Sequence, residues 1–253
     1  DIAAKYGSAG VITGTNVFAH LHELDDAVEG MKMLLAPDGV IAIEAPYAVP
    51  LIEHLEYDTI YHQHVGYLSV KPMHAYFERF GFELFDVIPR DIHGGTLRYY
   101  VGHKGAHPVL SSVDEYIKKE ESFGLYDKNR LKRFANDVQA QRVAFRSLLH
   151  DLKKQGKRIA AISAPAKGNT LLNYCGIDSA YLDYATEKAA LKVGKFTPGT
   201  HIKIEPDSKI LLDQPDYALI LAWNFAKEIM ANMEEYKKRG GKFIIPIPSP
   251  RIV

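Results

Sequence analysis

The chain has 253 residues, of which 47% are hydrophobic and 25% charged, and its 31 basic side chains balance 31 acidic ones. This composition excludes an intrinsically disordered chain, a collagen-like fibre and a small disulfide-stabilised protein. The zero net charge argues against nucleic-acid binding, and no apolar run reaches the roughly 20 residues of a membrane span. The single cysteine, Cys175, permits no internal disulfide, so we expect a protein of the reducing cytoplasm with neither nucleic acid nor membrane as partner.

The first part of the chain alternates predicted strands and helices. Hydrophobic patterning predicts strands over residues 11–15, 40–45, 83–87 and 96–101. Helices are expected from Asp25 or Asp26 to Leu35, over residues 50–55, and from Ser69, as the N-cap, to Gly81, with a turn at residues 37–39. The short connection between the last two strands indicates an antiparallel pair. This order predicts a doubly wound α/β sheet with an antiparallel edge hairpin.

A charged helical stretch from Ser111 to Gln155, broken at Gly124, leads to the second part of the chain. There, strands are predicted over residues 159–162, 181–184, 217–223 and 243–247. A loop over residues 163–169 precedes a helix to Tyr174, and a further helix is expected over residues 225–238. The repeated strand–helix alternation predicts a second, smaller Rossmann-like α/β domain.

Ligands of open parallel sheets bind beyond the carboxyl ends of the strands. In the first part of the chain this position falls on residues 16–20, and in the second part on residues 163–169 and on Trp223 and Asn224. The loop at residues 163–169 lacks the G-x-G-x-x-G pattern of dinucleotide binding. Its Lys167 and the following helix N-terminus suit a phosphate or diphosphate, with a plain turn and a solvated lysine as the alternative.

The segment from Asp58 to His64, with the sequence DTIYHQH, concentrates side chains that exchange protons. Histidine accepts a proton near neutral pH, and a tyrosine hydroxyl can donate to a developing oxyanion. A metal site at His62 and His64 and a structural histidine pair are the alternatives. Further along, Gly94 and Gly95 follow His93 and allow either close approach of a ligand or a hairpin turn.

These segments together resemble the S-adenosylmethionine-dependent C-methyltransferases that act on nucleotide-linked deoxysugars. The matching stretches are residues 16–20, 58–64, 93–98, 164–176, 197–202 and 215–230, so the resemblance covers essentially the whole chain. It implies part of a class I methyltransferase sheet with an antiparallel edge hairpin, followed by a second Rossmann-like domain. Residues 1–108 would form the C-terminal half of the methyltransferase domain, 109–156 the connecting helices, and 157–253 the C-terminal nucleotide-binding-like domain.

The resemblance also implies roles for individual residues. His64 matches the catalytic base, and Tyr61 and His20 match further active-site residues. Gln63 stands where the better-known sugar enzymes have a glutamate; an amide can orient a neighbour by hydrogen bonding, but it cannot relay a proton as a carboxylate can. The hypothesis is therefore C-methylation of a nucleotide-linked keto deoxysugar through an enolate. The expected ligand contacts are Asn16 and Val17 for S-adenosylmethionine, His93 and Gly94 for the sugar, and Ser163, Lys167, Asn169 and Asn224 for the diphosphate and base.

In this family a zinc-binding lobe and a glycine-rich cofactor loop precede the region matched here. We therefore expect this chain to be a fragment that binds S-adenosylmethionine weakly by itself, with zinc only in the preceding lobe. The alternative functions are an O- or N-methyltransferase acting on a related substrate and a non-catalytic module that binds a sugar nucleotide. A dinucleotide-dependent oxidoreductase is disfavoured, because no G-x-G-x-x-G follows any predicted strand.

Overall fold

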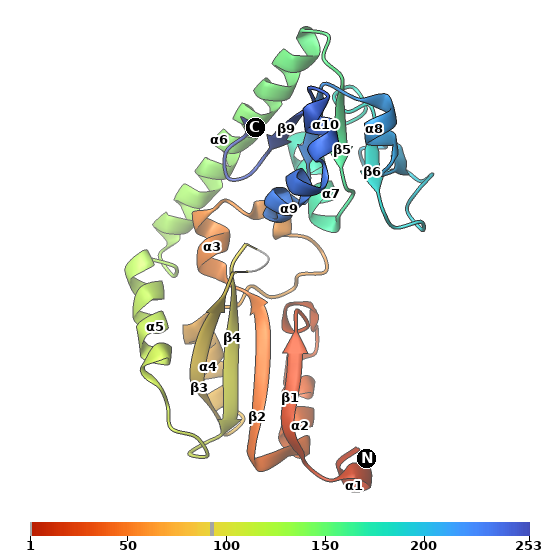
Figure 1. The fold of residues 1–253 in the computed structure, drawn as a ribbon. Coiled ribbons are helices and arrows are strands. Elements are labelled where there is room, and N and C mark those ends of the chain that lie inside the picture. Colours follow the sequence, from red (N-terminus) through yellow and green to blue (C-terminus); the bar gives the residue numbers. More distant parts are fainter. Residues whose placement is uncertain (1, 92–93) are drawn as a thin grey trace. The chain divides into compact units, whose positions relative to one another are not determined.

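The structure is a computed structural model that describes residues 2–91 and 94–253. Its contacts divide the chain into two units, each with one sheet and its own helices (Figure 1). The first unit comprises Asp1–Glu53 and His62–Lys132, and the second comprises His54–Tyr61 and Arg133–Val253. The short segment His54–Tyr61 therefore belongs with the second unit, although the chain on either side of it belongs to the first.

The first unit is built on a four-stranded sheet with the strand order β1-β2-β4-β3. Its strands are β1 (Ala9–Thr15), β2 (Leu35–Pro46), β3 (Phe82–Arg90) and β4 (Thr96–His103). β1 runs parallel to β2, whereas β4 is antiparallel to both β2 and β3. The mixed α/β class and the antiparallel edge hairpin predicted from the sequence are thereby confirmed.

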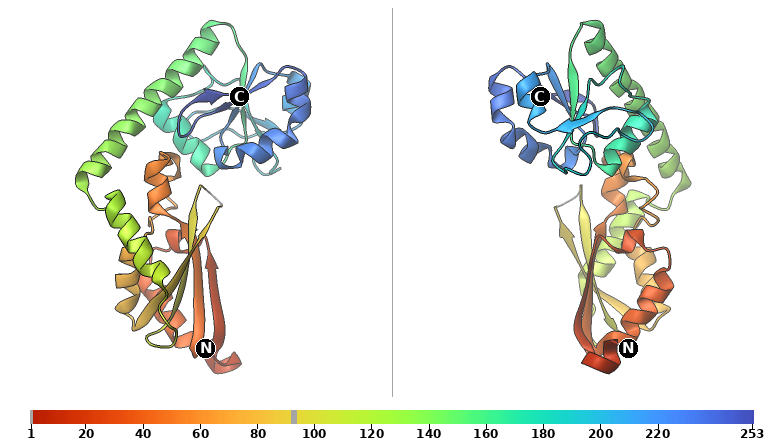
Figure 2. Two further views of the ribbon diagram at one scale, coloured as in Figure 1. Left: turned by 60° about the vertical axis from the view of Figure 1, so that its left-hand side comes forward. Right: turned by 90° about the vertical axis from the view of Figure 1, so that its right-hand side faces the viewer.

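Apolar helix faces cover this sheet. The helices of this unit are α1 (Ile2–Tyr6), α2 (Leu24–Leu34), α3 (Ala48–Glu53), α4 (Val70–Glu78) and α5 (Ser111–Phe123), of which α1 buries none of its residues. α2 and α4 lie along the same face of the sheet (Figures 1 and 2), and α4 and α5 both pack on β3. Val28 of α2, Phe77 of α4 and Phe82 of β3 are fully buried. Burial of these side chains is the main favourable contribution to the stability of the unit.

The second unit is built on a six-stranded sheet with the order β10-β9-β8-β5-β6-β7. Its strands are β5 (Ile159–Ile162), β6 (Ala185–Glu187), β7 (Ile204–Pro206), β8 (Tyr217–Ile220), β9 (Lys242–Ile245) and β10 (Arg251–Ile252). All neighbouring strands are parallel except β10, which is antiparallel to β9. Successive strands run outward in opposite directions from β5, so the switch point of the topology lies between β5 and β8.

Helices cover both faces of this second sheet. They are α6 (Lys128–Lys154), α7 (Ala166–Cys175), α8 (Lys209–Asp213), α9 (Ala226–Asn232) and α10 (Glu234–Lys238). On one face Ala161 and Leu219 belong to a core with Phe145 of α6, and on the other Ala160 belongs to a core with Tyr236 of α10. Burial on both faces explains why these strands are continuous apolar runs. Among the described residues, no helix is long and apolar enough to span a membrane.

The strand predicted over residues 181–184 was wrong. The backbone N–H groups of Tyr181 and Leu182 both donate to Asp178 O, and the Asp178 carboxylate accepts from Ala180 N. These turn bonds use the N–H groups of residues 180–182, whereas Asp183 N donates to Ile159 O and Tyr184 O accepts from Ala161 N of β5. The strand β6 therefore begins only at Ala185.

Several predicted boundaries also differ. Residues 37–39 continue β2 without a turn, and residues 166–169, expected in a loop, form the first turn of α7 after Pro165. The helix expected over residues 225–238 is divided at Met233 into α9 and α10, and the strand expected to reach Trp223 ends at Ile220. Ser69 precedes α4 without a side-chain capping bond; the Glu120 carboxylate accepts the first helical N–H groups instead.

Candidate active site

The carboxyl end of β1 carries the residue expected to meet the methyl donor. Asn16 directly follows β1 with φ 55°, a left-handed conformation that asparagine tolerates better than most residues. Its backbone N–H donates to Glu44 O of β2 at 2.8 Å. The Asn16 side-chain oxygen is buried and has no hydrogen-bond partner among the described residues, while Val17 is exposed. This edge of the sheet thus presents an unused acceptor beside an exposed apolar side chain.

Two segments that are far apart in the sequence meet directly beyond β1. The 3₁₀ turn Phe18–His20 brings Ala19 O within hydrogen-bond distance of Val65 N, at 2.8 Å. His20 Nδ1 lies 2.7 Å from Gln63 O, and the ring centroids of His20 and His64 are 4.8 Å apart. The structure therefore brings together His20, Gln63 and His64, three of the four predicted catalytic residues, within the first unit.

The bond at Gln63 O also determines the tautomer of His20. A carbonyl oxygen only accepts hydrogen bonds, so His20 Nδ1 carries the proton that it donates. In the neutral ring, Nε2 is then left with a lone pair. Neutral His20 can therefore accept a proton or a hydrogen bond through Nε2.

The fourth predicted catalytic residue, Tyr61, is half-buried and lies in the segment that belongs to the second unit. Burial raises the pKa of its hydroxyl, and the negative charge of Asp58 acts in the same direction. Tyr61 thus retains its proton at neutral pH and can act as a hydrogen-bond donor.

The glycine loop before β4 is described from Gly94 onward, and the predicted sugar contact His93 lies outside the described residues. Gly94 and Gly95 both have positive φ, and Gly95 O accepts a hydrogen bond from Tyr47 N at 3.1 Å. A Cβ added at Gly95 would lie 2.9 Å from Pro50 Cγ. A glycine is therefore required at position 95, because φ is positive there and a side chain would contact Pro50 too closely.

At the switch point of the second unit, Lys167 is already engaged. Its ammonium group lies 4.0 Å from the ring centre of Trp223 and donates to the side-chain oxygen of Asn224. Burial lowers the pKa of Lys167, while the charges of Asp58 and Glu56 act in the opposite direction. The alternative of a solvated lysine is wrong, because the side chain is half-buried in this network.

The other predicted diphosphate contacts surround the start of α7. Ser163 directly follows β5 with φ 52°, so both Asn16 and Ser163 adopt left-handed backbone conformations immediately after a parallel strand. Such conformations are costly for serine and concentrate at functional sites. Asn169 donates from its side chain to Pro165 O at 3.3 Å, and its side-chain oxygen is buried without a partner among the described residues.

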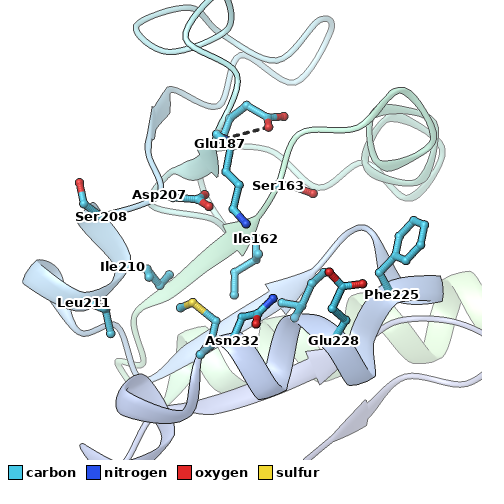
Figure 3. Close-up of a pocket in the computed structure, with 13 residues that line it drawn as sticks. Ile162, Ser163, Glu187, Asp207, Ser208, Ile210, Leu211, Phe225, Glu228 and Asn232 are labelled. Atoms are coloured by element: carbon cyan, nitrogen blue, oxygen red, sulfur yellow. Dashed lines mark hydrogen bonds between the residues drawn. The ribbon is translucent and has the colours of Figure 1, made fainter.

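A cavity of about 540 Å³ opens beside Ser163, on the side of the sheet that carries α8 and α9. Figure 3 shows Ile162 and Ser163 between Phe225 and Glu228 on one side and Asp207 and Ser208 on the other, with Glu187 at the rim. Lys167, Asn169 and Asn224 do not line this cavity. The predicted contacts in the second unit therefore fall into two groups, one around Lys167 and one around Ser163.

Sequence reasoning missed Glu187, which ends β6 and lines the cavity. Although partial burial opposes ionisation, hydrogen bonds from Lys192 and from backbone N–H groups lower the pKa of this carboxyl. An acidic residue that ends the second strand of a β–α–β unit is a recognisable ribose-binding signal. The signal went unnoticed because the strand was predicted at residues 181–184.

The metal-site alternative for His62 and His64 finds no support in the described part of the chain. No group of three or more histidine, cysteine, aspartate or glutamate side chains is arranged there to hold a metal ion. The buried cysteine Cys175 lies 3.4 Å from the Tyr57 hydroxyl.

Comparison with known protein families agrees with this architecture. Residues 1–87 match the model of a methyltransferase domain, and residues 91–248 match that of a C-methyltransferase C-terminal domain. The chain belongs to the C-methyltransferase family. It is 35% identical over its whole length to the C-methyltransferase NovU of Streptomyces niveus, and it spans about 60% of the length of that relative.

Family membership makes S-adenosylmethionine the expected methyl donor, and the residues at the end of β1 fit this group in part. The unpartnered oxygen of Asn16 can accept a hydrogen bond, and the exposed Val17 offers apolar contact.

Proposed function

We propose that the protein carrying this chain is an S-adenosylmethionine-dependent C-methyltransferase that acts on a nucleotide-linked keto deoxysugar through an enolate. The observation that carries the proposal is the meeting of His20 with the Gln63–His64 segment beyond β1. Imidazole is the side chain best suited to accept a proton from carbon at neutral pH, and its position at the carboxyl end of a parallel strand is where ligands bind.

In this proposal His64 removes the proton from the carbon next to the sugar ketone. The negative charge that develops on the ketone oxygen is stabilised by a hydrogen bond from the Tyr61 hydroxyl, which stays protonated because burial raises its pKa. Neutral His20 presents the lone pair of Nε2, which suits orienting a neighbouring N–H better than donating to an oxyanion. Gln63 contributes through its backbone oxygen, which holds the His20 ring.

When bound, S-adenosylmethionine supplies an electrophilic methyl group on a sulfonium sulfur. Asn16 and Val17 would hold this donor at the end of β1. Because a carbon nucleophile must approach the methyl group in line, the main contribution of the chain beyond the base is to orient the two reactants.

The nucleotide part of the substrate would bind the second unit. The positive charge of Lys167 and the start of α7 favour a diphosphate, with Asn169 and Asn224 as polar neighbours. The cavity beside Ser163 has an apolar floor that suits a planar base, and Glu187 could accept from a ribose hydroxyl. The sugar would lie near Gly94 and the adjoining His93. We further propose residues 1–108, 109–156 and 157–253 as methyltransferase domain, connecting helices and nucleotide-binding domain.

The experiment is His64→Asn in the complete protein, assayed with methyl-¹³C-labelled S-adenosylmethionine and nucleotide-linked keto sugars. Loss of a general base is expected to lower kcat/KM by about 100-fold to 10,000-fold. The matched control is His62→Asn, an exposed histidine two residues away that should leave kcat/KM within about twofold of wild type. Near-normal turnover of His64→Asn would show that another residue is the base.

The NMR spectrum of the product separates the alternatives. A labelled methyl group attached to carbon supports the proposal. Attachment to oxygen or nitrogen supports the alternative of an O- or N-methyltransferase, which the replacement of glutamate by Gln63 favours. Binding of the sugar nucleotide without any turnover would instead indicate a non-catalytic binding module.

A further inference from the structure

A buried acid–aromatic–base network joins three segments of the second unit, around Asp58, Lys167 and Trp223. Trp223 Nε1 donates to Asp58 Oδ2 at 2.7 Å, and the Asp58 side chain is completely buried. On the ring of the same tryptophan lies the ammonium group of Lys167, which also donates to Asn224. Trp223 therefore uses its N–H to hold a carboxylate and its ring face to hold a cation.

The residue before Asp58 anchors the same segment independently. The Tyr57 hydroxyl donates to Gln141 Oε1 of α6 at 2.6 Å, and its ring lies 5.2 Å from that of Tyr174 on α7. Tyr57 is 6% exposed, so these contacts are shielded from water. Segment His54–Tyr61 is thus attached to the second unit by side chains at two successive positions.

Because Tyr61 is close to Asp58 in the chain, the attachment of Asp58 also restricts the position of Tyr61. Tyr61 follows Asp58 by three residues, and an extended chain advances at most about 3.6 Å per residue. The Tyr61 Cα is therefore held within about 11 Å of the Asp58 Cα, on the unit that carries Lys167. The hydroxyl proposed to donate to the enolate is presented by the unit proposed to bind the diphosphate.

We propose that Asp58 and Trp223 are positioning residues, whose hydrogen bond fixes residues 58–61 so that Tyr61 meets the reacting sugar. This inference rests on the proposed function. Because Asp58 is fully buried, its proposed action is through the backbone that leads to Tyr61. Trp223 serves the same purpose from the switch point of the sheet, where its ring also supports Lys167.

A network that served only to stabilise the fold would have different consequences. Its loss would lower the unfolding temperature and the amount of active protein, and the turnover of the molecules that remain folded would not change. A positioning role predicts lower kcat in fully folded protein, because small displacements of a catalytic group have large effects on rate. The two roles are separated by kcat per folded molecule, with the KM for S-adenosylmethionine measured alongside.

The experiment uses the complete protein with three variants. Trp223→Phe keeps a ring beneath Lys167 but removes the N–H donor, and Asp58→Leu removes the acceptor. Asp58→Asn keeps an acceptor oxygen without the charge. We expect Trp223→Phe and Asp58→Leu to lower kcat by about tenfold or more, with the KM for S-adenosylmethionine unchanged within about twofold. Asp58→Asn should retain at least about a third of the wild-type kcat, because the hydrogen bond survives.

Two further measurements make the test specific. The double variant Asp58→Leu/Trp223→Phe should be no slower than the slower single variant, because both changes remove the same bond. The indole N–H resonance of Trp223, assigned by its disappearance in Trp223→Phe, should lose its hydrogen-bonded shift in Asp58→Leu and keep part of it in Asp58→Asn. Tyr181→Phe, which removes an aromatic hydroxyl that accepts a hydrogen bond from Arg146 in the second unit, is the control that should keep normal kcat.

The outcomes are distinguishable. If the kcat of Trp223→Phe is within twofold of the wild-type value, the positioning proposal is overturned. This variant tests the hydrogen bond even if Asp58→Leu does not fold. Asp58→Asn as slow as Asp58→Leu also overturns it, because the charge rather than the bond would then matter. If the wild-type protein transfers the methyl group to oxygen, only the proposed function is overturned. The kcat values of the variants can then still be compared for transfer to oxygen. Absence of any methyl transfer by the wild-type protein overturns both.

Discussion

At the scale of single residues, the second unit contains two buried carboxyl groups whose ionisation is costly. Burial raises the pKa of Glu56 to about 8 and that of Asp58 to about 6, although the charge of Lys167 lowers both. Asp58 is also stabilised as an anion by the N–H of Trp223. The charge of Lys167, which is proposed to bind a diphosphate, therefore also acts on the two buried carboxyl groups.

These values predict how stability depends on pH. Between pH 4.5, the ordinary pKa of a glutamate, and about pH 8, its raised pKa in the folded protein, Glu56 is ionised in the unfolded chain but keeps its proton in the folded one. Folded-state stability is therefore lost as pH rises through this window, by up to about 1.4 kcal/mol per pH unit. Glu56→Gln cannot ionise, so denaturant unfolding between pH 5 and pH 8.5 should show a flatter dependence than for wild type.

The exposed Glu53→Gln variant is the control and should follow the wild-type pH profile. Asp58 contributes with the same sign between pH 3.8 and about 6, and it remains present in both proteins. Parallel profiles for Glu56→Gln and wild type would show that Glu56 is ionised in the folded state at neutral pH.

At the scale of elements, helix α4 is capped by a side chain from α5. The Glu120 carboxylate is fully buried and accepts from Val70 N and Lys71 N, the first two N–H groups of α4. The Tyr126 hydroxyl donates to the same carboxylate. A carboxylate at a helix N-terminus is favoured by both hydrogen bonding and the helix dipole, so Glu120 replaces the local cap expected at Ser69.

We predict that Glu120→Gln lowers the free energy of unfolding by about 1–3 kcal/mol, because the amide presents donors to groups that are themselves donors. The measurement is equilibrium denaturation followed by circular dichroism. Glu121→Gln, which removes only the half-exposed ion pair with Lys71, should cost less than about 1 kcal/mol. Equal effects of the two substitutions would contradict the capping role of Glu120.

At the scale of the whole molecule, the chain forms two units with separate sheets and separate cores. Phe77 is fully buried in the first unit and Phe145 in the second. Trp223, as the single tryptophan of this chain, makes the emission excited at 295 nm a reporter for the second unit. A core substitution can therefore be made in either unit while the fluorescence of Trp223 reports the unfolding of the second unit.

We predict that Phe145→Ala lowers the denaturation midpoint reported by Trp223, in line with a loss of about 3–5 kcal/mol for a buried phenylalanine. Phe77→Ala should leave this transition near its wild-type midpoint while lowering the stability of the first unit, as measured by hydrogen exchange of β3 and β4. An equal shift of the Trp223 transition in both variants would mean that the units unfold as one cooperative block.

Much of the fold was predictable because its signals are local. The antiparallel pairing of the strands around residues 83–87 and 96–101 follows from their short connection, and β5 and β8 are apolar runs buried on both faces. The prediction failed at residues 181–184, where the side chain of Asp178 competes for backbone donors. Such competition depends on side-chain geometry, which hydrophobic periodicity does not encode.

For the candidate site as well, some features follow from local sequence and others depend on contacts between distant segments. The sequence by itself determined that Asn16 and His20 follow a strand and that residues 58–64, with His64, concentrate side chains able to exchange protons. Only the tertiary structure decided that His20 meets Gln63 across 43 positions and that Trp223 holds Asp58 across 165. Local periodicity specifies helices and strands, whereas contacts between distant segments depend on strand order and on side-chain packing in the folded chain.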